Sequence, residues 1–448
     1  MREPGDRRRA GRAAAMNACS TETVPAVSAI FGQNRAAPTT VHFMMHPESA
    51  ATVAPVSIPF LAVPLLSLAA FCSGISLRVT DPLLPLLAHE FGVTLGHASR
   101  VVMMFSIAYG ISQLFFGPLG DRYGKYLVIA CASGACAVTA TLCGLAPNFP
   151  LLLLARLLAG GTAAAIIPLS MAWIGDVVPY ERRQPVLARF LIGQILGLSA
   201  GVLTGGLAAD ANDWRLPFFI IGLVFLVVCV GLLALNRRLP EQARIRHRAS
   251  GPVLPRMVNE FRQVLVRPWA RMVLLTVFLE GAFVYGAFAF IASHIYRTFH
   301  IPLSTAGALV MLFGFGGMLF ALSSAKMVKS LGETGLSRWG GLLLALSFLA
   351  IALAPVWWWS VPACFLAGLG FYMLHNTLQT NATQMAPERR GAAVSAFASS
   401  FYMGQSVGVG VAGAMVGRFG TGAVIAVGAA GVMVAAMRFS LRVGQKAS

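Results

Sequence analysis

Four ionisable residues interrupt apolar stretches that are long enough to cross a lipid bilayer, and they are the first candidates for chemistry. They are Arg78, Asp81, Arg156 and Glu280. A charge in hydrocarbon costs at least about 2.5–3.5 kcal/mol, so a chain retains one there mainly where it pairs or performs a function. Arg78 and Asp81 are three positions apart and would share a helix face, where they can pair with each other or reach the outer surface. These residues predict a polar site among the helices.

Glu280 is the most isolated of the four. It lies near the middle of the apolar stretch 270–297, with no base within a helical turn along the sequence. Because desolvation favours the neutral form of a carboxylic acid, we expect Glu280 to bind and release a proton near neutral pH. A structural hydrogen bond to a neighbouring helix is the alternative explanation.

An arginine within an apolar span would serve a different purpose from a carboxylic acid. A guanidinium does not give up its proton, so Arg156 would tune a nearby acid or hold an anion. A packing ion pair is the alternative for Arg156. All four buried ionisable residues are therefore candidates for coupling protons to a larger event.

The stretch 357–384 is unusually polar for an apolar span. Tyr372, His375, Asn376 and Gln379 recur at helical spacing and can line a pathway. His375 can titrate near neutral pH, although a lone histidine also serves as a simple hydrogen-bond partner. Polar groups elsewhere either line the same pathway or join helices; they are Tyr109, Gln113, Gln194, Tyr285 and Gln405.

The composition indicates which elements must position these residues. Hydrophobic residues make up 57% of the chain and charged residues 11%, whereas soluble domains carry about 25% charge. The net charge of +18 does not indicate nucleic acid, because the bases lie in short loops between apolar spans. The seven cysteines show no metal-ligand spacing and are expected to be free thiols. The sequence thus predicts an all-α integral membrane protein with no metal and no cofactor.

Twelve apolar spans are predicted, and their positions divide the chain into a tail, a first bundle, a loop, a second bundle and a second tail. Residues 1–56 are predicted to be a disordered basic cytoplasmic tail. Six spans in 57–236 form an N-terminal bundle, and six in 270–442 form a C-terminal bundle. Between them, 237–269 is a basic cytoplasmic loop in which Val258, Phe261, Val264 and Leu265 suggest a helix on the membrane surface. Residues 443–448 are a second tail, and the bias of bases places both termini in the cytoplasm.

The two bundles repeat one another. Phe91 and Phe299, Gly124 and Gly332, and Pro179 and Pro387 are separated by the same 208 positions (299 − 91, 332 − 124 and 387 − 179). Parallel six-span repeats around a central pathway are typical of secondary transporters. We therefore expect two parallel six-helix repeats.

The loop after the second span carries the most specific motif. Its residues Gly117, Asp121, Arg122, Gly124 and Lys125 resemble the signature G-x-x-x-D-R-x-G-[RK]-[RK] of the major facilitator superfamily, with Tyr126 in place of the last base. The resemblance implies the major facilitator fold. It also implies a gating charge cluster at the cytoplasmic face, to which Asp176 and Arg182 would belong. The alternative is that the bases fix orientation and Asp121 caps a helix.

Two further stretches resemble motifs of the same superfamily. Arg156 precedes Gly160 by four positions, as in the fourth-span motif, which implies that it faces the cavity. The fifth span resembles the signature G-x-x-x-G-P-x-x-G-G of drug/proton antiporters, with Val202 in place of the proline. Glycines spaced four apart also explain close helix packing by themselves; they are Gly193, Gly197, Gly201 and Gly205.

Taken with this resemblance, the sequence predicts a secondary active transporter of the twelve-span drug/proton antiporter branch. The expected activity is proton-coupled efflux of a small organic molecule or drug by alternating access. The alternative is proton-coupled uptake of a small anionic metabolite, held by Arg78 and Arg156. A membrane-embedded enzyme is not expected, because the eight histidines are scattered and the sequence offers no convergent Ser/His/Asp or metal set. No nucleotide-binding loop G-x-x-x-x-G-K-[ST] occurs, so ATP is not expected to drive transport directly. The expected protein works as a monomer in a bacterial inner membrane and does not bind nucleic acid.

Overall fold

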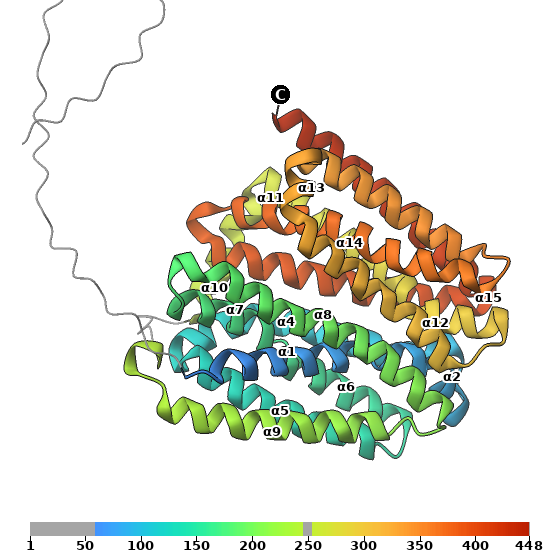
Figure 1. Ribbon diagram of the computed structural model, residues 1–448, viewed down its shortest axis with the longest axis horizontal. Helices are drawn as coiled ribbons and strands as arrows, with labels where there is room; N and C mark the ends of the chain where they lie inside the picture. Colours follow the sequence, from blue (N-terminus) through green and yellow to red (C-terminus); the bar gives the residue numbers. More distant parts are fainter. Residues whose placement is uncertain (1–58, 245–252, 448) are drawn as a thin grey trace, which may run out of the picture. The chain divides into compact units, whose positions relative to one another are not determined.

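The computed structural model describes residues 59–244 and 253–447, and every regular element in these ranges is a helix (Figure 1). The predicted tail 1–56 lies outside the described residues, as do 245–252 of the predicted central loop. The α-helices are α1 (Ala62–Arg78), α2 (Thr80–Glu90), α3 (Leu95–Ala98), α4 (Arg100–Tyr123), α5 (Lys125–Leu145), α6 (Phe149–Ala163), α7 (Ile166–Val177), α8 (Tyr180–Asp210), α9 (Leu216–Arg238), α10 (Val253–Val266), α11 (Pro268–Glu280), α12 (Gly286–Phe299), α13 (Leu303–Ala352), α14 (Ser360–Gln384) and α15 (Arg390–Ala447). Shorter turns are η1 (Glu241–Arg244), the π-helical η2 (Gly281–Tyr285), η3 (Trp357–Trp359) and η4 (Pro387–Arg389).

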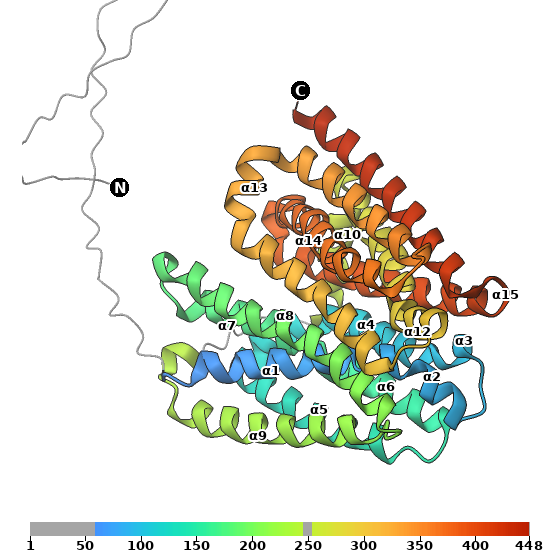
Figure 2. The same cartoon turned by 45° about the vertical axis from the view of Figure 1, so that its right-hand side comes forward.

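Several of these helices, alone or joined end to end, are long and apolar enough to cross a membrane. By length and composition the described part contains nine such helices, or ten when α1 and α2, which meet at a bend of 41°, form one span. The 50-residue α13 and the 58-residue α15 each contain a break at a glycine, Gly332 and Gly420. Figure 2 shows the chain turning back within both helices. The breaks divide each of these two helices into two segments, and the count of twelve spans stays a prediction beside the nine or ten that length and composition give for the described residues.

The outward faces of the bundle are apolar. On α9, Leu223, Val227 and Val230 are 63%, 59% and 60% exposed, and they lie on successive turns of the same helix. Such a continuous apolar face has no stable partner in water, whereas a bilayer solvates it and leaves the helical hydrogen bonds intact. The chain is an integral membrane protein.

The two halves share one backbone plan. Six described residues have positive φ, and they form three pairs 208 positions apart: Gly92 with His300, Gly124 with Gly332, and Asn212 with Gly420 (300 − 92, 332 − 124 and 420 − 212). In the described part of the chain, left-handed backbone therefore occurs at equivalent turns of both halves. This confirms the predicted repeat.

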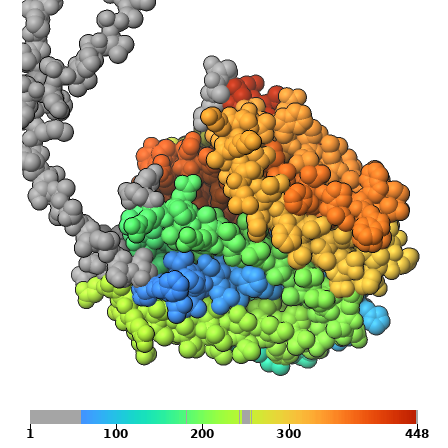
Figure 3. Space-filling model, in the orientation of Figure 1, coloured from blue at the N-terminus to red at the C-terminus, as the bar shows by residue number. Residues whose placement is uncertain are grey.

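Glycine contacts hold the helices of each half close together. In the N-terminal half, α1 lies between α8 and α9 (Figure 3), and a Cβ on Gly193 of α8 would collide with the backbone of Ser67. In the C-terminal half, a Cβ on Gly404 of α15 would likewise collide with the backbone of Phe278 in α11. Small residues at these points let the helix backbones approach each other in the absence of a hydrophobic driving force.

The halves meet along two seams near one end of the bundle. On one seam α8 approaches α13, where Gly206 lies against the backbone of Leu303. On the other seam α4 and the preceding α3 approach α15, where Gly96 lies against Gly413. We call this the seam end, and we call the other end, which carries the Gly117–Lys125 hairpin, α10 and η4, the charged end.

The contact between the halves weakens toward the charged end. On α4, Gly110 packs against Tyr402 of α15, but a Cβ added to Gly117, two turns further on, would meet no atom within 4 Å. The same holds for Gly391 on α15. Figure 2 shows α8 and α13 converging toward the seam end and separating toward the charged end. The arrangement is closed at the seam end.

Candidate functional site

The first polar group at the centre is the pair Arg78 and Asp81, at the bend between α1 and α2. Both residues are buried, at 2% and 1% exposure, and Arg78 Nη1 lies 3.5 Å from Asp81 Oδ2. The bend arises where Pro82 cannot supply a backbone N–H to continue the helix. The second carboxylate oxygen, Asp81 Oδ1, is buried and has no hydrogen-bond partner in the described part of the chain. The two residues therefore pair within the protein and do not reach the surface.

Arg78 also reaches across to the other half. Its Nη2 donates to Oε1 of Gln405 on α15 at 3.3 Å, and Gln405 Nε2 donates to Oγ of Ser106 on α4 at 2.8 Å. The guanidinium carbon lies 3.9 Å from the centre of the Tyr285 ring, a geometry that allows a cation–π interaction. Two of the predicted pathway residues, Gln405 and Tyr285, thus contact Arg78 at the junction of the halves.

Arg156 is fully buried and supports the bend in the first span. Its Nη1 donates to the Ser76 carbonyl at 2.9 Å, its Nε to the Val101 carbonyl at 3.3 Å, and its Nη2 to Thr80 Oγ1 at 3.4 Å. The guanidinium also lies over the Phe105 ring, 4.3 Å from its centre. These partners are backbone carbonyls and a hydroxyl, not the carboxylate that a packing ion pair would require.

Glu280 has a partner that its own sequence neighbourhood does not show. Its Oε2 lies 2.8 Å from Nδ1 of His375 on α14. The Glu280 side chain is 0% exposed and that of His375 is 19% exposed. The other oxygen, Glu280 Oε1, is buried without a hydrogen-bond partner among the described residues. Glu280 is the last residue of α11, and the π-helical η2 follows it directly. Wide turns of this kind are often found at functional positions.

Aromatic side chains surround this pair. The His375 ring lies 5.1 Å from Phe371, 5.4 Å from Phe397 and 4.8 Å from Phe401, measured between ring centres. Tyr285 packs edge-on against Phe401 at 5.5 Å. The site is therefore a carboxylate–imidazole pair set in an aromatic wall of the C-terminal half.

The remaining predicted pathway residues are more dispersed. Tyr109 is buried and lies 4.3 Å from the ring of Tyr402 across the halves. Tyr372 packs on Phe371 within its own half. Burial differs among the others: Gln113 is buried, Gln194 and Asn376 are half-buried, and Gln379 is exposed. The sequence prediction missed Tyr402 and Ser106, although Tyr402 precedes Gln405 by three positions on the same helix face.

At the charged end, Lys125 is the centre of the predicted charge cluster. Its Nζ lies 3.2 Å from Asp121 Oδ1 and 2.7 Å from Asp176 Oδ2, so it joins the hairpin to the end of α7. Arg122 and Arg182 are exposed, and Arg122 lies over the Tyr123 ring. The two ion pairs of Lys125 lie within the N-terminal half. Gly124, with φ of +95°, forms the turn that brings these charges together.

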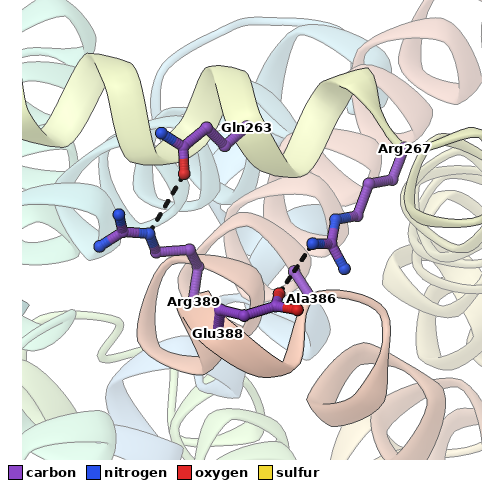
Figure 4. A pocket seen from close by; sticks show the side chains of 5 residues that line it. All are labelled: Gln263, Arg267, Ala386, Glu388 and Arg389. Carbon is purple, nitrogen blue, oxygen red and sulfur yellow. Dashed lines mark hydrogen bonds and ion pairs between the residues drawn. The ribbon is translucent and has the colours of Figure 1, made fainter.

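A second group of charges lies at the charged end of the C-terminal half. Figure 4 shows Gln263 and Arg267, from α10 and its end, facing Glu388 and Arg389 of η4. Arg267 Nη2 lies 2.7 Å from Glu388 Oε2, and Arg389 Nε donates to Gln263 Oε1 at 3.2 Å. They line a pocket of about 410 Å³. The amphipathic segment predicted in the central loop is thus a helix that is tied to the turn before α15.

The glycine stripe of the fifth span packs inside its own half. A Cβ on Gly197 or Gly201 would collide with α1, at Phe71 and Ile75 respectively, and one on Gly205 would collide with Val79, directly after α1. Gly193, the first of the stripe, faces α1 in the same way. In contrast, Gly206 faces α13, and Val202, which replaces the proline of the antiporter signature, directs its carbonyl toward Gly307 there. The stripe therefore serves packing within the N-terminal half, and the neighbouring positions form the seam.

Asp210, which the sequence prediction did not single out, joins the halves at the seam end. Its carboxylate oxygens accept hydrogen bonds from the backbone N–H groups of Leu303 at 2.8 Å and Ser304 at 2.9 Å. These N–H groups begin α13 and have no partner within that helix. A residue of α8 thus caps a helix of the other half.

The fold, two repeated helical halves with a buried polar site at their junction, is that of a membrane transporter. The chain matches the model of the Major Facilitator Superfamily over residues 66–409, and it belongs to this family.

Its similarity to individual proteins is more distant. It is 27% identical over 348 residues to the uncharacterized MFS-type transporter YceJ of Bacillus subtilis (strain 168), covering 77% of this chain and 86% of that protein. It is 23% identical over 345 residues to the quinolone resistance protein NorA of Staphylococcus aureus (strain MRSA252), covering 76% and 86%.

Solved structures share the fold. The nucleoside transporter NupG aligns with a TM-score of 0.67 and 15% identity over 85% of this chain and 97% of that chain. A bacterial homolog of the human lysosomal transporter Spinster, in an inward-facing and unoccupied conformation, aligns with a TM-score of 0.63 and 18% identity over 85% and 93%.

Proposed function

We propose that this chain is a proton-coupled exporter of a small, lipophilic organic molecule that works by alternating access. The observation that carries the proposal is the buried pair of Glu280 and His375, with its 2.8 Å hydrogen bond and an oxygen, Glu280 Oε1, that has no partner among the described residues. A carboxylate with one unsatisfied oxygen in a low-dielectric interior gains from binding either a proton or a donor on a substrate. Proton and substrate can therefore compete for the same atom.

The difference in exposure between the two residues gives the proton a route. The Glu280 side chain is fully buried, whereas that of His375 is 19% exposed, so His375 is the more accessible member of the pair. Its Nδ1 lies within hydrogen-bonding distance of Glu280 Oε2, so the imidazole can pass a proton to the carboxylate. We assign proton binding to Glu280 and proton entry to His375.

The same region joins the proton site to the contact between the halves. Glu280 leads into η2, which ends at Tyr285, and the Tyr285 ring lies against the Arg78 guanidinium. Gln405, which bonds Arg78, lies beside the turn that follows Glu280. A change in the charge of Glu280 would alter the packing of Tyr285 and Gln405 against Arg78. Asp81 is the other partner of Arg78. This is a physical link between protonation and the movement of the halves.

The aromatic wall supports a flat, apolar substrate. The rings of Phe371, Phe397 and Phe401 are buried around His375 in the state described, and they would offer aromatic area for stacking, with few polar groups to satisfy, once the halves move apart. Similarity to the quinolone resistance protein NorA supports export of a drug-like molecule.

We further place the charged end at the cytoplasmic face, with both termini there, in a bacterial inner membrane. The distribution of bases supports this orientation. The seams would then be closed on the outer face, and the state described would be inward-facing. In this proposal 57–236 and 270–442 are the two rocking bundles, and the Lys125 cluster would contribute to gating.

Uptake of an anionic metabolite is less well supported. It requires Arg78 and Arg156 as free clamps, but the donors of Arg156 already bond Ser76, Thr80 and Val101. Arg78 is itself paired with Asp81 and Gln405. Displacing these partners would leave buried groups unsatisfied.

The test is quinolone transport in everted membrane vesicles energised by a proton gradient. Glu280→Gln should abolish proton-driven accumulation, and His375→Gln should slow it and shift its pH profile. The matched control is Glu90→Gln, an exposed acid at the seam end. If Glu280→Gln accumulates substrate with the wild-type pH dependence, the assignment of the proton site is wrong.

A further inference from the structure

A cavity at the seam end lies apart from the Glu280 site and takes no part in the proposed proton step. It has a volume of about 860 Å³, within the range of about 300–1,000 Å³ that holds small ligands. Its walls come from both halves: α2, α3 and α8 on one side, and α12, α13 and α15 on the other. The cavity therefore depends on the closed seams.

The lining has a marked chemical bias. Arg297 and His89 contribute basic side chains, and Tyr296, which is 38% exposed, contributes a ring with a hydroxyl. Leu86 and Val93 supply apolar surface, and none of the lining residues in the described part of the chain is acidic. The closest acid along α8 is Asp210, whose two oxygens are engaged by Leu303 and Ser304. The cavity therefore has positive charge and apolar walls together.

We propose that this cavity binds an amphipathic organic anion, such as an aryl sulfonate or carboxylate, and that the bound anion holds the seams closed. The anionic group would bond Arg297, as guanidinium groups bind such oxygens with charge-assisted hydrogen bonds. Its ring system would lie against Tyr296 and the apolar wall.

The effect on the transporter follows from the geometry of the walls. A ligand that touches both halves binds only while they are together, so it favours the closed seam by its differential affinity for the two states. Such an anion would lower the rate of transport without competing for the Glu280 site. The inference goes beyond the proposed export and does not depend on the identity of the exported molecule.

The binding test uses the full chain in phosphatidylcholine nanodiscs with 1-naphthalenesulfonate as the probe, measured by isothermal titration calorimetry. Arg297→Gln should weaken the probe about tenfold, the effect of losing one charge-assisted hydrogen bond. Arg418→Gln is the matched control, because it removes an exposed base that does not line the cavity. Val93→Trp, which fills the cavity, should also weaken binding. Equal affinity for wild type and for both cavity variants would overturn the site.

A second arm tests the dependence on closed seams and the source of the anion. Asp210→Ala, which removes the cap between the halves, should weaken the probe, and unchanged affinity would overturn the claim that binding needs the closed state. Adding phosphatidylglycerol to the nanodiscs should lower probe affinity if a lipid headgroup is the natural occupant; unchanged affinity assigns the site to a free anion. Loss of proton-driven export in Glu280→Gln with intact probe binding would separate the two proposals.

Discussion

The cap that Asp210 places on α13 predicts a measurable change in the balance between the closed and open seam. Its carboxylate accepts two hydrogen bonds, from the N–H groups of Leu303 at 2.8 Å and Ser304 at 2.9 Å. The bonds exist only while the halves are together, because donor and acceptor belong to different halves. Their loss therefore affects one conformational state and not the other.

The size of the effect follows from measured helix caps. Replacing an N-terminal capping residue with alanine costs about 0.5–2 kcal/mol, and a carboxylate at a helix N-terminus also gains about 0.3–1 kcal/mol from the helix dipole. We expect Asp210→Ala to shift the equilibrium away from the closed seam by about 1–2 kcal/mol, a factor of ~5–30. The solvent-exposed position of Asp210 favours the lower part of this range.

The assay is thiol labelling of a cysteine placed inside the seam. Ser99 is 1% exposed and lies against Gly413 of the other half, so Ser99→Cys should react only when the seam opens. In a background without the native cysteines, Asp210→Ala should raise its labelling rate about 5–30-fold.

The chain offers a matched control for this change. Asp213 Oδ1 accepts from the N–H groups of Arg215 and Leu216 at 3.1 Å each, and so caps α9 within its own half. Asp213→Ala should therefore leave the labelling rate of Ser99→Cys unchanged. Equal rates for the two alanine variants and the wild type, with normal insertion, would refute the idea that Asp210 stabilises the closed seam.

Three further outcomes are expected. Gly201→Leu should prevent stable insertion rather than only slow transport, because the leucine side chain would enter α1 of the same half. The thermal stability of the extracted protein measures this effect, and a normal melting temperature would contradict close packing of Gly201 against α1. Asp176→Asn should lower stability by about 1 kcal/mol or less, since the pair with Lys125 is partly exposed, and an unchanged melting temperature together with unchanged transport would remove its role. Glu388→Arg should impair transport and the double variant with Arg267→Glu should restore it, whereas failure of rescue would mean that this ion pair does not matter.

Much of the architecture was predictable because it depends on local or strictly periodic features. The length of each apolar run predicts whether it can cross a membrane. The offset of 208 positions predicts the repeat, which the three pairs of positive-φ turns confirm. The pairing of Arg78 with Asp81 was also accessible, since three positions on a helix bring two side chains to one face. Such arguments need no knowledge of which helices are neighbours.

Partners from other helices could not be predicted in this way. Glu280 and His375 are 95 positions apart, and each gave a separate signal as an ionisable group in an apolar span. A helix presents a polar residue to one of several neighbours, and nothing in its own periodicity selects which. The packing of α11 against α14 brought the two together.

The glycine stripe of α8 and Asp210 also show that the sequence alone does not identify which helix a residue contacts. Glycines spaced four apart predicted close packing, because only a small side chain admits another backbone, but the spacing could not say that α1 is the partner. Asp210 gave no signal, since an acid at the end of a span is ordinary in sequence. It became a contact between halves only because the tertiary structure brings the free N–H groups of α13 to it, and hydrogen bonding at a helix end depends on position in space rather than on order along the chain.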